Sequence, residues 1–291
     1  MVAQVRRFNR IVTQRVGALN ERFLARNRPL GEARLLWEIG AEGRDVRSLR
    51  AQLELDSGYL SRLLRSLESA GLVTVGHKDS DKRVGIARLT RRGRAERAVL
   101  ERRADELATS LLAPLGATQS ARLVAAMADV ERLLTASMIE VAPIDPAHPD
   151  ARHCLRAYFT ELDRRFDAGF DPALSIPADD DELRPPAGLF LVAKLRTQPI
   201  GSGALKFHNK APAELKRMWV DESVRGLGIG RRLLSDLETH ASKHGVRTVR
   251  LETNKTLVEA ISLYRSAGYA EVAAFNDEPY ADHWFEKQLE D

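Results

Sequence analysis

Apolar residues in the first half of the chain recur at the three-to-four-residue spacing of amphipathic helices. This spacing predicts helices over residues 2–24, 31–39, 91–112 and 120–135. Short segments rich in glycine or proline separate them, which is where helices end. The pattern therefore indicates a mostly helical domain over residues 1–136.

Two shorter helices occupy the middle of this domain. Ser48 is expected to cap the first, which ends at Leu53, and Asp56 or Ser57 to cap the second. Gly71 suits the left-handed position that terminates the second helix. Two helices joined by a tight turn form a helix-turn-helix unit. The polar face of its second helix carries Ser57, Tyr59, Ser61, Arg62 and Arg65.

A β-hairpin follows this unit directly. Residues 72–75 and 84–89 are β-prone, and the polar segment 76–83 between them makes a basic tip. A recognition helix followed by a basic hairpin is the order of a winged helix. The helix then enters the DNA major groove, while Lys82 or Arg83 reaches a phosphate or the neighbouring minor groove.

The pattern of apolar positions changes after residue 136. Strand-like alternation, a helical stretch and a loop come first, over residues 137–144, 151–166 and 169–186. Antiparallel strands are then expected over 188–195, 200–207 and 213–220. A helix to about residue 243, a strand over 246–252, a helix over 253–267 and strands over 268–274 and 283–289 complete the chain. The sequence predicts an α+β chain, with a mixed-sheet α/β domain over residues 137–291.

Composition narrows the class of protein. The chain has 291 residues, and no apolar run approaches the roughly 20 residues of a membrane helix. Its start alternates apolar and charged residues and lacks the features of a secretory signal, so we expect a cytoplasmic protein without membrane contact. The single cysteine, Cys154, excludes an internal disulfide and a thiolate metal cluster, and no metal site is expected.

Charge is distributed unevenly between the two halves. Residues 1–136 contain 25 Lys+Arg and 16 Asp+Glu, a balance of +9, whereas the rest contains 20 and 25, a balance of −5. A basic half predicts a polyanionic partner. Together with the helix-turn-helix and the basic hairpin, it predicts binding to double-stranded DNA.

Three sequence features of the first half occur in a specific order. They are the run SLRAQLELDSGYLSRLLRSLESAGLV, the DSDKR segment with Asp81 and Arg83, and the LT-x-x-G step of Leu89, Thr90 and Gly93. With these features the first half resembles the MarR family of winged-helix transcription regulators. The resemblance implies a homodimer, formed by the first and last helices, that binds a DNA operator. Its recognition helices would lie about 34 Å apart, one turn of DNA.

A glycine-rich loop follows the strand expected to end at Val220. It reads Arg225-Gly226-Leu227-Gly228-Ile229-Gly230-Arg231. Glycines let backbone N–H groups converge at a helix N-terminus, an arrangement that binds a diphosphate. A nicotinamide cofactor is the weaker alternative, because the loop does not open a βαβ unit and no ribose-binding acid follows a second strand.

The loop, the LETN run and the segment AISLYRSAGY stand in one order from residue 137 to the end. This half resembles the GNAT superfamily of acyl-CoA N-acyltransferases. The resemblance implies an N-acetyltransferase that uses acetyl-CoA and transfers acetyl directly to the amine of a small molecule. It places the pyrophosphate at residues 225–231 and the pantetheine arm along Met218, Trp219 and Val220, whose N–H groups polarise the thioester carbonyl. Asn254 then contacts the cofactor arm.

The resemblance also implies an acid and a base. Tyr264 stands where many members place the acid that protonates the departing thiolate. Glu214 is the first candidate for the base that accepts the amine proton, and Glu252 is the second. Structural roles are the alternatives: Tyr264 could fill the core, and Glu214 could be an ordinary strand carboxylate. Tyr280 and His283 could line the acceptor site.

Two other functions remain open at this point. The second domain could be a sensor that binds CoA or another ligand without turnover, which would leave a pure regulator. It could also acetylate protein lysines or N-termini, because its acidic balance suits a cationic acceptor. Net charge does not separate a basic peptide from a small polyamine or an aminoglycoside-like drug.

Overall fold

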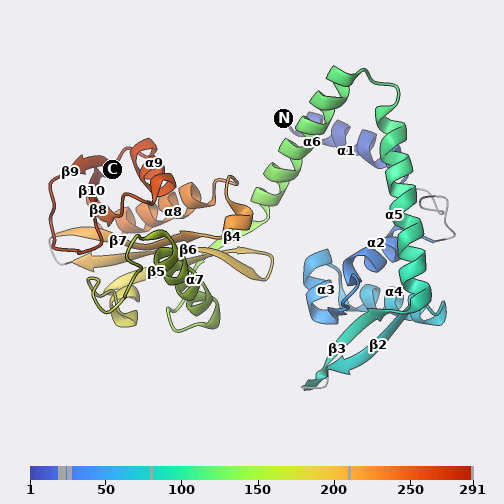
Figure 1. The fold of residues 1–291 in the computed structure, drawn as a ribbon, viewed down its shortest axis with the longest axis horizontal. Coiled ribbons are helices and arrows are strands. Elements are labelled where there is room, and N and C mark those ends of the chain that lie inside the picture. Colours follow the sequence, from blue (N-terminus) through green and yellow to red (C-terminus); the bar gives the residue numbers. More distant parts are fainter. Residues whose placement is uncertain (19–23, 25–27, 79–80, 209–210, 290–291) are drawn as a thin grey trace. The chain divides into compact units, whose positions relative to one another are not determined.

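The computed structural model describes residues 1–18, 24, 28–78, 81–208 and 211–289, with side chains omitted for 77, 78, 81–84 and 211. The chain divides into two compact units, Met1–Met127 and Ala128–Asp291 (Figure 1). This division falls inside helix α6 (Ala117–Ser137), whereas the boundary expected at residue 136 lies near the end of that helix. Within the described residues, no helix has the length and apolar character needed to cross a membrane.

The first unit is built from helices and one small sheet. Its elements are α1 (Val2–Arg15), α2 (Leu30–Ile39), β1 (Arg44–Asp45), α3 (Val46–Leu53), α4 (Ser57–Ser69), β2 (Val73–Lys78), β3 (Asp81–Leu89) and α5 (Arg91–Leu112). The antiparallel sheet has the order β1-β3-β2. Residues 19–23 of the first expected helix lie outside the described part of the chain.

The helix pair α3 and α4 follows the sequence pattern closely. Asp56 caps α4 by accepting the Tyr59 N–H at 2.8 Å, and Gly71 after the helix has φ +68°. The cap of α3 is Asp45, which accepts the Ser48 N–H at 2.8 Å, so the expected cap at Ser48 is wrong. The helix begins three residues earlier than a cap at Ser48 would place it, because the short strand β1 pairs with β3 and ends at Asp45.

The second unit is a sheet covered on both faces. Its elements are β4 (Ile139–Pro143), α7 (Pro149–Arg165), η2 (Asp180–Leu183), β5 (Gly188–Leu195), β6 (Gln198–His208), β7 (Ala211–Val220), η3 (Glu222–Val224), α8 (Ile229–Lys243), β8 (Thr248–Thr253), α9 (Val258–Ser266), β9 (Ala270–Val272) and β10 (His283–Gln288). Its strands in the described residues follow the order β4-β5-β6-β7-β8-β10-β9. Among these described strands, β7 and β8 are the one parallel pair, and α8 connects them.

Strand β5 explains why both faces are covered. Phe190 and Val192 pack in the core under α7, whereas Leu189, Leu191 and Ala193 pack in the core under α8 and α9 (Figure 1). Because adjacent side chains point to opposite faces, a strand buried on both sides needs a continuous apolar run.

Strands β7 and β8 separate soon after they begin to pair. Among the described residues, their pairing is limited to Ala213 with Val249 and Glu214 with Arg250. On the other side of β7, the register with β6 shifts between Ser202 and Ala204, which is a β-bulge. Arg217 stands in this bulge at φ +58°, and its carbonyl oxygen accepts the Ser202 hydroxyl at 3.1 Å. The left-handed backbone costs about 1–3 kcal/mol and persists where the surrounding structure enforces it.

Candidate functional site

The glycine-rich loop leads into the N-terminus of α8. Gly226 and Gly228 have φ +83° and +78°, and Gly228 is the N-cap residue. Within the described residues, no side chain caps this helix. A Cβ at Gly230 would lie 3.2 Å from the Leu263 side chain, so this glycine also permits close packing against α9. The loop thus leaves the first N–H groups of α8 available to an anion.

A cavity of about 450 Å³ lies beside this loop. Most residues expected to bind the cofactor line it: Met218, Trp219, Val220, Arg225, Gly226, Gly228, Ile229, Gly230, Arg231 and Tyr264. Two others lie elsewhere. Leu227 packs against the hydrophobic core, and Asn254 lines a neighbouring pocket instead. The loop therefore places its glycines and arginines at one cavity and turns its leucine inward.

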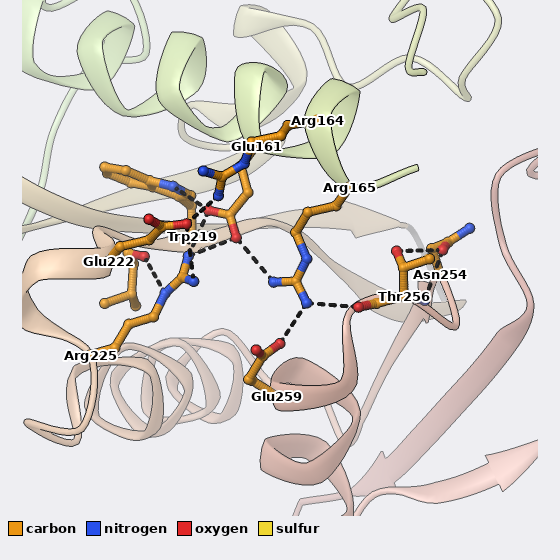
Figure 2. Close-up of polar contacts among 10 residues, drawn as sticks. Glu161, Arg164, Arg165, Trp219, Glu222, Arg225, Asn254, Thr256 and Glu259 are labelled. Carbon is orange, nitrogen blue, oxygen red and sulfur yellow. Dashed lines mark hydrogen bonds and ion pairs between the residues drawn. The ribbon is translucent and has the colours of Figure 1, made fainter. Parts of the chain in front are cut away.

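Glu161 on α7 is the centre of a polar network at this cavity (Figure 2). Its carboxylate accepts two hydrogen bonds from Arg225 at 2.6 and 2.7 Å, one from the Trp219 indole at 3.0 Å and one from Arg165 at 3.1 Å. Its side chain is 13% exposed, so these contacts are shielded from water. Glu161 was not identified from the sequence. The four-residue spacing of Glu161 and Arg165 on a helix could have indicated their ion pair, but no sequence signal indicated the contacts with Arg225 and Trp219.

Arg165 extends the network to the start of α9. Its guanidinium donates to the Thr256 carbonyl at 2.7 Å and contacts the Glu259 carboxylate at 2.7 Å (Figure 2). Arg225 also donates to the Val220 carbonyl at 3.1 Å. The network therefore joins α7, the end of β7, the glycine-rich loop and α9 around one cavity.

A second, smaller pocket of about 90 Å³ lies where β7 and β8 have separated. Its wall includes Leu215 to Met218 from β7 and Glu252 to Asn254 from the end of β8. The two cavities share lining residues, which are Tyr158, Leu162, Met218, Leu257, Ala260 and Tyr264. The two cavities therefore adjoin at these residues.

Tyr264 belongs to this shared wall. The residue is 5% exposed, and burial raises the pKa of its hydroxyl above the ordinary value. In the described part of the chain, the hydroxyl has no hydrogen-bond partner. The hydroxyl is therefore protonated at neutral pH, and the residue lies in the wall that the two cavities share.

Glu214 lies away from both cavities described above. Its carboxylate contacts Arg250 at 2.7 Å, Lys216 at 3.4 Å and His208 at 3.4 Å. Burial raises the pKa of Glu214, but the charges of Lys216 and Arg250 and the hydrogen bond from Arg250 outweigh burial and lower it. Its position and its ion pairs argue against Glu214 as the base that serves the cleft.

The second base candidate, Glu252, does line the smaller pocket. It forms an ion pair with Lys216 and accepts a hydrogen bond from Asn276 at 3.5 Å. Asn254 has a structural role there, because its amide donates to the Tyr280 carbonyl at 2.8 Å and accepts the Thr256 N–H at 3.0 Å.

The two remaining acceptor-site candidates separate. Tyr280 lines the smaller pocket, whereas His283 pairs with Glu271 at 2.7 Å and lies outside both cavities described above. His283 belongs to β10, whose neighbour β9 carries Glu271. Its geometry is that of a surface ion pair.

The residues expected to read DNA share the outer face of α4. Ser57, Tyr59, Ser61, Arg62 and Arg65 are all exposed. The opposite face is buried and consists of Leu60, Leu63, Leu64 and Leu67. Lys82 and Arg83 belong to β3 by their backbone, but their side chains lie outside the described residues.

The ion pairs of Glu214 predict a pH-dependent stability. A carboxyl whose folded pKa is lowered stabilises the fold above its ordinary value near 4.3, and this contribution is lost as the pH falls through the folded pKa. We expect Glu214→Gln to lower the free energy of unfolding of the second unit by about 1.5–3 kcal/mol at pH 7 and by less at pH 3. Urea unfolding in a Trp37→Phe background measures it, since Trp219 and Trp284 report on this unit.

Glu140→Gln is the matched control, because Glu140 is an exposed strand carboxylate. It should leave the unfolding free energy unchanged at both pH values. An equal loss in the two variants, or a Glu214→Gln loss that does not shrink in acid, would contradict the stabilising role of the Glu214 ion pairs.

Comparison with known proteins identifies the family of the second unit independently of the site geometry. The model of the acetyltransferase (GNAT) family matches residues 154–269. An IAA acetyltransferase of Azospirillum brasilense is 35% identical over 121 residues, which are 41% of this chain and 78% of the relative. The mycothiol acetyltransferase of Cellulomonas flavigena is 37% identical over 98 residues, which are 30% of this chain and 28% of that protein.

The solved structures include an acetyltransferase from Streptococcus agalactiae, with 19% identity and a TM-score of 0.44 over 52% of this chain and 99% of that one. The family match covers most of α7, the glycine-rich loop and Tyr264, all of which contribute to the walls of the two cavities. The chain belongs to the GNAT family of acetyltransferases, enzymes whose acetyl donor is acetyl-CoA.

Proposed function

We propose that the second unit transfers acetyl directly from acetyl-CoA to the amine of a small molecule. One observation carries this proposal: a cavity beside an anion-binding loop adjoins a pocket between separated strands, and Tyr264 lines both. Direct transfer requires that donor and acceptor be bound together. Two adjoining cavities supply that arrangement.

The residues at the larger cavity fit a cofactor with a diphosphate. The open N-terminus of α8 supplies backbone donors, and Arg231 supplies positive charge at the same wall, whereas the Arg225 guanidinium is held by Glu161. Acetyl-CoA, when bound, supplies the acetyl thioester that the amine attacks. Residues 226–231 hold its pyrophosphate in this proposal, and the Met218 to Val220 strand receives its arm.

Proton transfers are assigned to residues of the shared wall and the smaller pocket. The Tyr264 hydroxyl, kept protonated by burial, gives its proton to the thiolate as the C–S bond breaks. Glu252 accepts the amine proton, directly or through water, because it is the base candidate that lines the smaller pocket. Its ion pair with Lys216 keeps the carboxylate in place.

Gly228 provides a test of the anion-binding loop. Its φ of +78° is unsuited to a β-branched residue, so we expect Gly228→Val to weaken CoA binding at least tenfold, measured by titration calorimetry. Gly245→Val is the matched control, because Gly245 has φ +76° at the other end of α8 and lies outside the described cavities. Equal affinity in the wild type and both variants would remove the loop from the cofactor site.

Tyr264→Phe tests the acid. We expect kcat for thiol release to fall by roughly 10²- to 10⁴-fold, with little change in CoA affinity. Because the pKa of Tyr264 is raised, the wild-type rate should show no loss from its ionisation up to about pH 10. Tyr269→Phe is the control, since Tyr269 packs against Tyr264 at 5.9 Å but lies outside both described cavities.

The same assay addresses the alternatives. Tight acetyl-CoA binding by the wild type, without thiol release above background across a panel of primary amines, would favour a non-catalytic sensor. Release with basic peptides but not with small amines would favour protein acetylation. Unchanged kcat in Tyr264→Phe would contradict the role of its hydroxyl.

For the first unit, we propose the DNA-binding regulator that the MarR resemblance implies. Support comes from α4, whose predicted contact residues share one exposed face while its leucines hold the other face in the core. Arg62 and Arg65 have no ion-pair partner in the described part of the chain. A face with available cations next to a hairpin suits a phosphate backbone.

A homodimer through the first and last helices completes this proposal. Helix α1 has no buried residue, and Val2, Val5, Phe8 and Ile11 are between 42% and 74% exposed. Helix α6 likewise exposes Val124, Met127, Leu133 and Leu134. Apolar side chains exposed in rows on two helices favour burial against another protein surface.

Gel-shift titration with the DNA upstream of the protein's own gene tests the regulator. We expect affinity to fall as salt rises, and the double variant Arg62→Gln and Arg65→Gln to reduce the salt slope by about 1 for each phosphate that the side chains no longer bind. Arg102→Gln on the exposed side of α5 is the control and should bind as the wild type does. Absent or salt-insensitive binding would contradict the proposal.

A further inference from the structure

The smaller pocket contains two opposite charges that have no ion-pair partner among the described residues. Arg217 and Glu278 both line it, and neither forms an ion pair with any residue of the described chain, including the other. The remaining charges of this pocket, Lys216 and Glu252, are paired with each other. An isolated charge in a largely buried pocket is unfavourable unless a ligand compensates it.

The guanidinium of Arg217 lies against two aromatic rings of α7. It is 4.8 Å from the centre of Phe159 and 5.8 Å from the centre of Tyr158. Its backbone lies in the β-bulge, where the register between β6 and β7 shifts. These cation–π contacts hold the guanidinium beside the two rings and leave N–H donors available, and their fork matches a carboxylate.

Glu278 is held by neutral groups. The residue is 8% exposed, and one oxygen accepts the Ser175 hydroxyl at 2.9 Å and the Ile176 N–H at 2.7 Å. The other oxygen accepts the Tyr280 N–H at 3.3 Å. These contacts fix the carboxylate in the pocket wall and leave its charge uncompensated. A positively charged ligand group would compensate it.

We propose that the acceptor is an α-amino acid whose carboxylate pairs with Arg217 and whose amino group lies on the side of Glu278. This inference rests on the proposed acetyltransferase and names its substrate class. One free cation and one free anion in a pocket of about 90 Å³ match a compact zwitterion. Glu278 attracts the protonated amine, which then loses its proton to a pocket carboxylate or water and attacks as the free amine.

The same charges disfavour other acceptors. A polyamine, an aminoglycoside or a protein lysine carries positive charge but offers no carboxylate to Arg217. Arg217 therefore repels such a ligand, and its own charge stays unpaired. The side group of the amino acid faces Phe166 and Phe170, which line the pocket and whose rings lie 5.7 Å apart. An apolar side group therefore suits this wall better than a charged one.

Matched pairs of ligands test the inference without any substitution. L-Phenylalanine is compared with phenethylamine, and L-alanine with ethylamine, so that each pair differs by the carboxylate. Calorimetric titration into the full-length protein saturated with CoA measures binding, and thiol release measures turnover. We expect the amino acid to bind roughly tenfold to a hundredfold more tightly than its amine, the effect of one charged hydrogen-bonded pair.

The variant Arg217→Asn tests whether Arg217 causes the preference for the carboxylate. Asparagine tolerates the left-handed backbone of the bulge, so this variant preserves the strand better than other neutral residues. The preference for the carboxylate should disappear, because the amino acid loses its cationic partner and the amine no longer meets an unpaired positive charge. Arg217→Lys should restore part of the preference, because it keeps the charge without the fork.

Two results would overturn the inference. They are equal binding of acid and amine by the wild type, and a preference that survives in Arg217→Asn. Failure of the proposed enzyme is distinguishable from both. If no amine releases thiol from acetyl-CoA, the transferase is wrong, and the calorimetric comparison still decides whether Arg217 binds a carboxylate.

Discussion

The separation of β7 from β8 is the constraint on which the rest of the second unit depends. A continuous sheet offers no internal cavity, because neighbouring strands lie within hydrogen-bonding distance along their length. Here pairing is limited to two residue pairs in the described strands, and the bulge at Arg217 bends β7 away. The smaller pocket occupies the opening, and the larger cavity continues it toward the glycine-rich loop.

Charged networks keep the walls of this opening in place. Glu161 connects α7 to the loop and to β7, and Arg165 connects it to α9. Such partly buried ion pairs add little net stability compared with apolar residues of similar shape, but the loss of one partner is costly because the other charge is left buried and unpaired. Glu214 connects strands in a similar way on the other side of β7. Its partner Arg250 lies where β7 and β8 pair, and its partner Lys216 lies where the two strands have separated. Carboxylates that orient arginines are therefore poor candidates for bases.

Much of the fold could be predicted, since burial requires a repeating pattern. The apolar run of β5, the stripe of α8 and the leucines of α4 each have the period of the element they form. The glycine-rich loop was also predictable, because its chemistry depends on consecutive residues. The cap of α3 shows the limit of prediction from local pattern. Asp45 caps the helix instead of Ser48, because Arg44 and Asp45 pair with β3 and the helix starts directly after them.

The sequence by itself determined the elements, the family of the second half and the residues of the phosphate-type loop, because these depend on contacts between near neighbours in the chain. Only the tertiary structure decided what Glu161, Glu214 and Arg217 do. Their partners are far away in sequence: Arg225 is 64 residues from Glu161, and Arg250 is 36 from Glu214. Whether a charge is paired or free depends on which elements fold against it, and this distinguishes a structural carboxylate from a ligand-binding arginine.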